Sequence, residues 1–128
     1  MKLLLDTCTF LWACAEPARL SSRARDLIRS PEHQVYLSAA SAWEMATKHA
    51  LGRLVLDESP ARLIPQLRRQ HGVESLAVDE ESVLHTARLP WLHKDPFDRL
   101  LVCQAIVHGM TLVTPDPLVA QYPARVIW

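Results

Sequence analysis

Four acidic residues in this 128-residue chain stand where their carboxylates could act together. These residues are Asp6, Glu44, Asp98 and Asp116. Carboxylates gathered without matching lysines repel one another, and burying several of them as ions is costly unless a cation joins them. Their oxygens suit Mg²⁺ or Mn²⁺, which bind through a few carboxylates and waters and leave positions for a substrate phosphate. Such a metal activates water and stabilises charge on a phosphoryl group, so the matching chemistry is phosphodiester hydrolysis.

The segments that must position these acids alternate between strand-like and helix-like patterns. Short apolar runs predict strands at residues 2–6, 34–38, 73–78, 110–114 and 125–128. Capping signals predict helices that start at Ser21 or Ser22, at Ser38 or Ser41, at Ser59, at Asp79 and at Asp95. A proline inside the third of these helices, Pro65, is expected to kink it or split it in two. The alternation predicts an α/β protein, a three-layer α/β/α sandwich with a central parallel sheet of four to five strands.

This fold class predicts where the acids meet. In open parallel sheets the functional crevice lies outside the carboxyl ends of the strands, where the winding reverses. If the chain winds one way for three strands and then crosses back, the first and fourth strands are neighbours, which brings Asp6 and Asp116 to one crevice. The helices begin at the same edge, so Glu44 and Asp98 are expected near it too.

Each acid also has a purely structural interpretation. A strand-terminal aspartate can cap the next helix, and Asp98, three residues after Asp95, has the spacing of a capping box. Glu44 could form an i,i+4 ion pair with Lys48, and Asp116 could serve as a turn residue between two prolines. The joint placement of the four acids at one edge favours a shared site.

Composition limits the class of protein. With 14 Lys+Arg against 14 Asp+Glu, bulk electrostatics give no argument for nucleic-acid binding. If metal neutralised the four acids, 10 of the 14 acidic residues would remain against 14 basic residues, and the rest of the protein would be mildly cationic. The length and the 49% hydrophobic content predict one domain over residues 1–128. Three cysteines that cannot all pair, and the lack of a signal peptide or membrane-length run, predict a cytoplasmic protein.

The acids lie in longer segments that have a known pattern: LLLDT followed by FLW, SAASAWEMATKHALGRL, HKDPFDRLLVCQA and TLVTPDPLVAQYPARVIW. Over essentially its whole length the sequence resembles PIN-domain ribonucleases, specifically the VapC toxins of bacterial toxin–antitoxin pairs. The resemblance implies a PIN-like fold and a metal-dependent endoribonuclease that hydrolyses RNA. It also implies that the acidic quartet binds one or two Mg²⁺ or Mn²⁺ ions.

The resemblance extends to three supporting residues, Asp95, Arg99 and Thr114. Thr114 matches a hydroxyl residue that supports the metal-bound water. Asp95 matches a recurrent acid and is either functional or a helix cap, and Arg99 matches a recurrent arginine that either contacts phosphate or pairs with a neighbouring acid. Cys8 departs from the family pattern, and we expect it to affect packing without touching the quartet.

The resemblance implies three partners: an RNA substrate, a cognate antitoxin protein and a second copy of the chain in a homodimer. The helical regions at residues 10–12, 20–28 and 63–67 would form the groove for an antitoxin segment. Trp43 and Trp91 lie in or beside apolar helical patterns and are expected in the core or at the homodimer interface, rather than as platforms for RNA bases. The six histidines lack HxxxH or HExxH spacing, which argues against zinc. His93 could contact RNA, but an ordinary solvated loop is the expected position for it.

Two other functions fit parts of the sequence. A PIN-fold binding protein with weak or lost nuclease activity would share the fold, but the intact quartet argues against it. A phospho-acceptor signalling module would share the length and the sheet, with Asp79 as a possible acceptor. Such modules carry an acidic pair after the first strand and a lysine after the fifth, whereas here Asp6 is followed by Thr7 and no lysine follows Lys94.

Overall fold

The computed structural model describes residues 1–128, and its centre is a parallel sheet of five strands in the order β3-β2-β1-β4-β5. The strands are β1 (Lys2–Leu5), β2 (Gln34–Ser38), β3 (Val73–Leu76), β4 (Thr111–Val113) and β5 (Arg125–Ile127). In the register, Leu4 lies opposite Tyr36 on one side and Leu112 on the other. The predicted sheet and its change of winding beside the first strand are confirmed. Asp6, expected as the last residue of that strand, instead follows it as the N-cap of the next helix.

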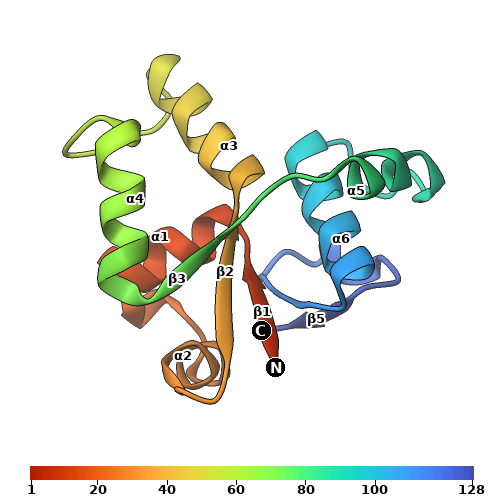
Figure 1. Ribbon diagram of the computed structural model, residues 1–128, viewed down its shortest axis with the longest axis horizontal. Coiled ribbons are helices and arrows are strands. Elements are labelled where there is room, and N and C mark those ends of the chain that lie inside the picture. The colour runs from red at the N-terminus through yellow and green to blue at the C-terminus, as the bar shows by residue number, and fades with distance from the viewer.

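Six α-helices connect and cover the strands (Figure 1). They are α1 (Thr7–Ala15), α2 (Ser22–Arg29), α3 (Ala39–Ala50), α4 (Pro60–His71), α5 (Glu80–His85) and α6 (Pro96–His108). Three short 3-10 helices are η1 (Pro17–Arg19), η2 (Thr86–Arg88) and η3 (Val119–Gln121). The sequence offered two candidate N-caps for each of α2 and α3. Ser21 caps α2 and Ser38 caps α3, and in each case the side-chain oxygen accepts a backbone N–H.

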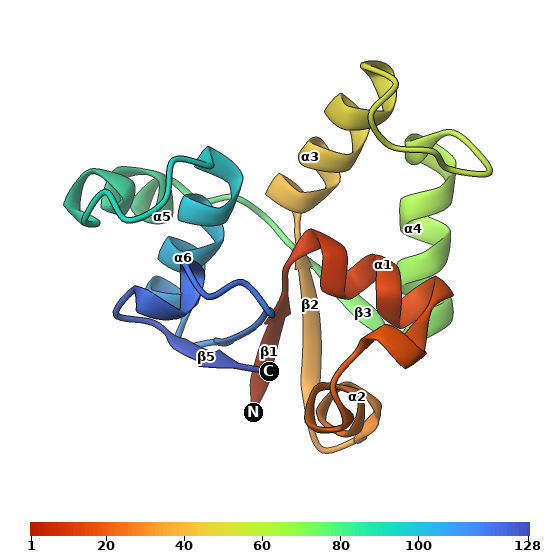
Figure 2. The ribbon, with the colours of Figure 1, turned by 180° about the vertical axis from the view of Figure 1, so that it is seen from behind.

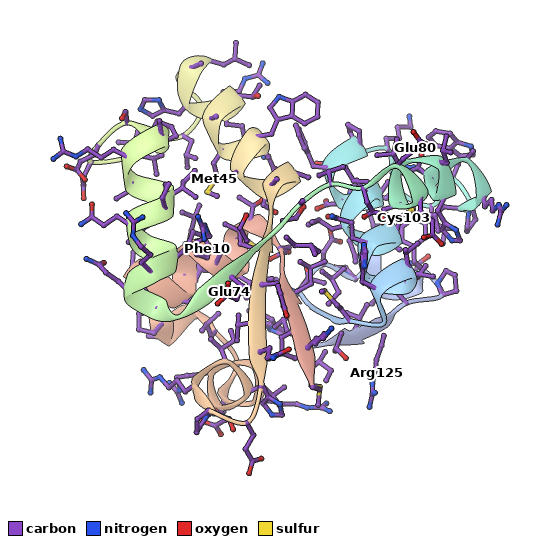
Figure 3. The ribbon with its side chains drawn as sticks, in the orientation of Figure 1. Phe10, Met45, Glu74, Glu80, Cys103 and Arg125 are labelled. Carbon is purple, nitrogen blue, oxygen red and sulfur yellow. The ribbon has the colours of Figure 1, made fainter.

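Helices pack on both faces of the sheet, which confirms the three layers. Because successive side chains of a strand point to opposite faces, Leu3 and Leu5 of β1 join one apolar core and Leu4 joins the other. The first core includes Phe10 and Met45, which lie between α1, α3 and α4 (Figure 3). The second core is built mainly by α6 and the segment around β4. Figure 2 shows the same division from behind, with α1 to α4 on one side and α5 and α6 on the other.

Of the two effects expected of Pro65, a kink or a split, the split does not occur. Helix α4 runs without a break from Pro60 to His71 and ends at Gly72, whose φ of 64° suits a left-handed C-cap. Proline removes only one intrahelical hydrogen bond here, the one to the carbonyl of Ala61 in the first turn. The burial of Ile64 in the first core stabilises the helix against that loss. None of the helices combines the length and apolar character that a membrane-crossing segment needs.

Asp79 ties the start of α5 to the end of α6. Its carboxylate accepts the Ser82 backbone N–H at 3.0 Å and lies 2.7 Å from Nε2 of His108. The hydrogen bond with His108, followed by those from Ser82, holds the pKa of Asp79 well below its usual range. A carboxyl whose pKa is lower in the folded chain than in the unfolded chain stabilises the fold when it is ionised. This contribution is fully present above the pKa of the unfolded chain, near 4, and is lost as the pH falls below it.

We therefore expect Asp79→Ala to lower the free energy of unfolding by about 1 kcal/mol at pH 7, mainly through the lost helix cap. The difference from wild type should shrink below about pH 4, where the unfolded-state carboxyl is protonated. Urea denaturation at pH 7 and pH 3 measures both values, and Glu58→Ala, in an exposed loop, is the control. Equal stability of Asp79→Ala and wild type at pH 7 would refute the prediction.

Candidate active site

The acidic residues meet at the carboxyl ends of β1 and β4. A hollow of about 300 Å³ lies there, bounded by the start of α1, by α3, by the start of α6 and by the loop after β4. Figures 1 and 2 show α3 extending away from this end of the sheet, and α6 beginning near it and running back along the sheet. The predicted quartet lines the hollow together with Thr7, Cys8, Lys48, Asp95, Pro115 and Pro117. The geometry thus brings Asp6, Glu44, Asp98 and Asp116 together, while their catalytic role stays a prediction.

Asp6 is oriented by three donors. Its Oδ1 accepts the Thr9 backbone N–H at 2.9 Å, which caps α1, and its Oδ2 accepts the Thr114 hydroxyl at 2.5 Å. Asp6 can therefore cap α1 with one carboxylate oxygen and still belong to the acidic site. The third donor is the Cys8 thiol, 3.4 Å from Oδ1, so the expectation that Cys8 does not touch the quartet is wrong. Burial, with the nearby Asp6 charge, raises the pKa of Cys8 to about 12, which keeps the thiol protonated as a donor.

Glu44 is buried in α3 with two partners. The Thr7 hydroxyl donates to its Oε1 at 2.6 Å, and Nζ of Lys48 lies 2.5 Å from its Oε2. The i,i+4 ion pair considered from the sequence therefore forms. The hydrogen bond with Glu44 raises the pKa of Lys48, which remains a cation. One half-exposed lysine therefore stands at the rim of the acidic cluster.

His93 is the residue that sequence reasoning missed. Its Nε2 lies 3.0 Å from Oδ2 of Asp98 and 3.3 Å from Oδ2 of Asp116, so it is in the site and not in a solvated loop. No ligand spacing in the sequence marks it, because the three residues come from two different loops and a helix. Asp116 also accepts the Leu118 backbone N–H at 2.9 Å, so its turn interpretation holds as well.

The site carries more negative charge than its cations balance. Burial, followed by the charges of Asp95, Asp6 and Glu44, raises the pKa of Asp98 to about 7, and His93 only partly opposes this. Four carboxylates from separate segments, with this excess of negative charge, are a donor set that fits a hard divalent cation such as Mg²⁺ or Mn²⁺.

Asp95 is the N-cap of α6. Its Oδ1 accepts the backbone N–H groups of Phe97 at 2.8 Å and Asp98 at 3.2 Å. The capping box considered for Asp98 does not form, since the Asp95 N–H donates to Nδ1 of His93 at 3.3 Å. The Asp98 carboxylate is therefore directed to the site, and Asp95 adds negative charge to the hollow.

Arg99 has neither of the roles considered for it. It is 3% exposed and donates to the carbonyls of Pro90 and Thr86, each at 2.8 Å, and to the Tyr122 hydroxyl at 3.1 Å. Its guanidinium carbon lies 3.9 Å from the ring centre of Trp91. No carboxylate contacts it, and its burial leaves no access for phosphate. Arg99 instead fixes the segment before α6 against η3.

Thr114 links the carboxyl ends of the neighbouring strands β1 and β4 at the site. It is buried, and its hydroxyl donates to Asp6 and accepts the Asp116 backbone N–H at 3.2 Å. Trp43 and Trp91 are 64% and 79% exposed, which excludes the core, and the homodimer interface stays a prediction for them. The Trp43 ring packs edge-on against Phe97, 5.0 Å between centres.

Comparison with known proteins agrees with this fold. The PIN domain family model matches residues 3–124, and the chain belongs to the PIN-domain family. Within the family it is 31% identical over 115 residues to Ribonuclease VapC22 of Mycobacterium tuberculosis, covering 89% of this chain and 86% of that protein. Ribonuclease VapC16 of the same organism is 34% identical over 64 residues, 50% of this chain and 45% of that protein.

A solved structure shows the same fold. The crystal structure of VapBC2 from Rickettsia felis, bound to a DNA fragment from their promoter, contains a chain that superposes with a TM-score of 0.72. The match covers 99% of this chain and 98% of that one at 14% identity. The resemblance and the fold class expected from the sequence are confirmed. The match to VapC16 spans less than half of that protein's length.

Proposed function

We propose that this chain is a metal-dependent endoribonuclease that hydrolyses RNA phosphodiester bonds, with residues 1–128 acting as one nuclease domain and as the toxin of a toxin–antitoxin pair. The observation that carries the proposal is the convergence of four carboxylates in one hollow where the winding of the sheet reverses. The VapC ribonucleases among its relatives support the activity. Membership of the PIN-domain family leaves no support for a phospho-acceptor module. Asp79, the residue that would accept the phosphoryl group in such a module, is paired with His108 outside the hollow.

In this proposal Asp6, Glu44, Asp98 and Asp116 hold Mg²⁺ or Mn²⁺. The bound metal would supply a water of lowered pKa and neutralise charge on the phosphoryl group. The hydroxyls of Thr114 and Thr7 fix the orientations of Asp6 and Glu44 before any ligand arrives. With the four acids compensated by metal, 14 basic residues face 10 remaining acids, which favours RNA only in the loaded protein.

A direct test incubates the protein with a single-stranded RNA and with DNA of the same sequence, in Mn²⁺ and in EDTA. We expect cleavage of the RNA in Mn²⁺ and none in EDTA. RNA cleavage that continues unchanged in EDTA would contradict the metal requirement. RNA binding without cleavage at any metal concentration would favour a PIN-fold binding protein that has lost nuclease activity.

An apolar groove offers a place for the antitoxin. It measures about 410 Å³ and lies between α1, α4 and the loop that contains Val55, and nine of its twelve lining residues are hydrophobic. Val55 is 93% exposed, an unusual state for an aliphatic side chain beside other apolar residues. The solved relative from Rickettsia felis is a VapBC assembly, which supports a partner protein for this chain. We propose that an apolar antitoxin segment occupies this groove.

Substitution of Val55 by aspartate should weaken antitoxin binding at least about tenfold, because a charge would replace apolar area buried on binding. The exposure of Val55 means that the fold should tolerate the change. The measurement is binding to the protein encoded by the adjacent open reading frame. Val78→Asp, an exposed valine that does not line the groove, is the matched control. Equal binding by both variants and wild type would exclude this groove.

We further propose a homodimer and a cytoplasmic location. Four large apolar side chains are exposed on α5 and the loop after η2, which supports burial of this surface against a second copy: Val83, Leu84, Trp91 and Leu92. All three cysteines are free, which agrees with a reducing compartment. Light scattering of the isolated protein measures the oligomeric state.

A further inference from the structure

His93 bridges two of the proposed metal ligands, and the two distances alone allow two roles. Its Nε2 lies 3.0 Å from Asp98 and 3.3 Å from Asp116, and the three donor atoms lie within 4.8 Å of one another. Neighbouring ligands of an octahedral ion with bonds of 2.0–2.1 Å are about 3 Å apart, so the geometry fits a ligand. The same distances fit hydrogen bonds from an Nε2–H group to the two carboxylates.

The other ring nitrogen decides between these roles. The backbone N–H of Asp95 donates to Nδ1 of His93 at 3.3 Å. A neutral imidazole carries its proton on one nitrogen and accepts with the other, so an accepting Nδ1 places the proton on Nε2. Ligation through Nε2 would move that proton to Nδ1, where it would face the Asp95 N–H donor. The amide at the N-cap of α6 would then lose its acceptor, at a cost in free energy.

The backbone of His93 is anchored from the opposite side. Its N–H donates to the Tyr122 hydroxyl at 2.9 Å, and the same hydroxyl accepts from the buried guanidinium of Arg99 at 3.1 Å. The imidazole therefore extends from a fixed support to the carboxylates of Asp98 and Asp116. Asp98 lies in the first turn of α6 and Asp116 lies in a loop between two prolines, and no other hydrogen bond in the structure joins these two side chains.

We propose that His93 is a positioning residue that holds Asp98 and Asp116 together through its Nε2–H without itself binding the metal. The proposal rests on the proposed function, because the two carboxylates are taken there as metal ligands. By fixing them before metal arrives, His93 reduces the reorganisation that binding requires. It also connects the buried Arg99 and Tyr122 support to the acidic hollow.

Calorimetric titration with Mn²⁺ tests the role without reference to activity. We expect His93→Ala to weaken Mn²⁺ binding by about 10- to 100-fold, the usual range for residues that orient metal ligands. His93→Gln retains a side-chain N–H donor and should recover affinity to within roughly threefold of wild type. His71→Ala, at the end of α4 and outside the hollow, is the matched control. Thermal unfolding without metal establishes that each variant is folded.

Pulsed electron paramagnetic resonance of the Mn²⁺-loaded wild type separates a positioning residue from a ligand. We expect no ¹⁴N coupling from a directly bound imidazole. A ¹⁴N coupling that disappears in His93→Ala would overturn the proposal in favour of ligation. Equal Mn²⁺ affinity in wild type and His93→Ala, or equal loss in the alanine and glutamine variants, would overturn it as well. If the wild type took up no Mn²⁺, the proposed function would fail first and this role with it.

Discussion

Replacing Asp98 or Asp6 with asparagine is expected to slow RNA cleavage by roughly 10²- to 10³-fold. The amide has the shape of the carboxylate but not its charge, so the remaining acids would hold a divalent cation weakly. An asparagine in place of Asp6 could still cap α1. Burial and the neighbouring acids raise the pKa of Asp98 to about 7, so its charge destabilises the metal-free fold at pH 8. Asp98→Asn should therefore unfold no earlier than wild type, and the loss of activity would not reflect misfolding.

The measurement is the single-turnover rate of cleavage of one labelled RNA in Mn²⁺, with melting curves recorded for each variant. Glu74→Gln is the control, because Glu74 is an exposed acid on β3, away from the hollow (Figure 3). It should cleave at the wild-type rate. Cleavage rates equal to wild type for both Asp6→Asn and Asp98→Asn would refute the proposal that these residues hold the metal.

Arg99→Ala is expected to lower the free energy of unfolding by about 3 to 4 kcal/mol, the largest stability effect that the structure predicts. Loss of the Arg99 guanidinium would leave the carbonyls of Thr86 and Pro90 and the hydroxyl of Tyr122 without a buried charged donor. Trp91 would also lose the guanidinium that lies against its ring. Arg99→Lys should recover only part of the stability, because an ammonium lacks the planar fork that reaches separate acceptors.

Urea denaturation of Arg99→Ala and Arg99→Lys measures this effect, and Arg88→Ala, an exposed neighbour on η2, is the control. The family resemblance left a phosphate contact open for Arg99. That role would give a different result: wild-type stability for Arg99→Ala, with weaker binding to RNA. Such a result would contradict the structural role derived from its burial.

The parts of the fold that were predictable depend on local signals. Ser38, Asp79 and Asp95 each stand before a helical pattern and accept a backbone N–H in the structure, as helix caps should. The continuous apolar character of β1 indicated a strand covered on both faces. The general rule for parallel sheets then placed Asp6 and Asp116 at the same edge.

The remaining features depend on side-chain direction and loop conformation, which single-sequence patterns do not define. Arg99 follows Asp98 in α6, but successive helical residues point about 100° apart, so one faces the hollow and the other the buried segment before α6. Glu44 is buried while its neighbour Trp43 is exposed, the reverse of what residue type alone suggests. His93 reaches the acids only because the loop before Asp95 turns its ring toward them.

We propose that the four carboxylates hold a divalent cation on which RNA cleavage depends. Parallel titration of one preparation tests it most directly, with calorimetry following Mn²⁺ binding and a labelled RNA following cleavage, for wild type and Asp98→Asn. We predict that wild-type cleavage rises with metal occupancy, reaches half its maximum at the same free Mn²⁺ concentration as binding, and is lost together with binding in Asp98→Asn. Undiminished cleavage by chelator-treated protein, or wild-type cleavage by an Asp98→Asn variant that binds no Mn²⁺, would contradict the account.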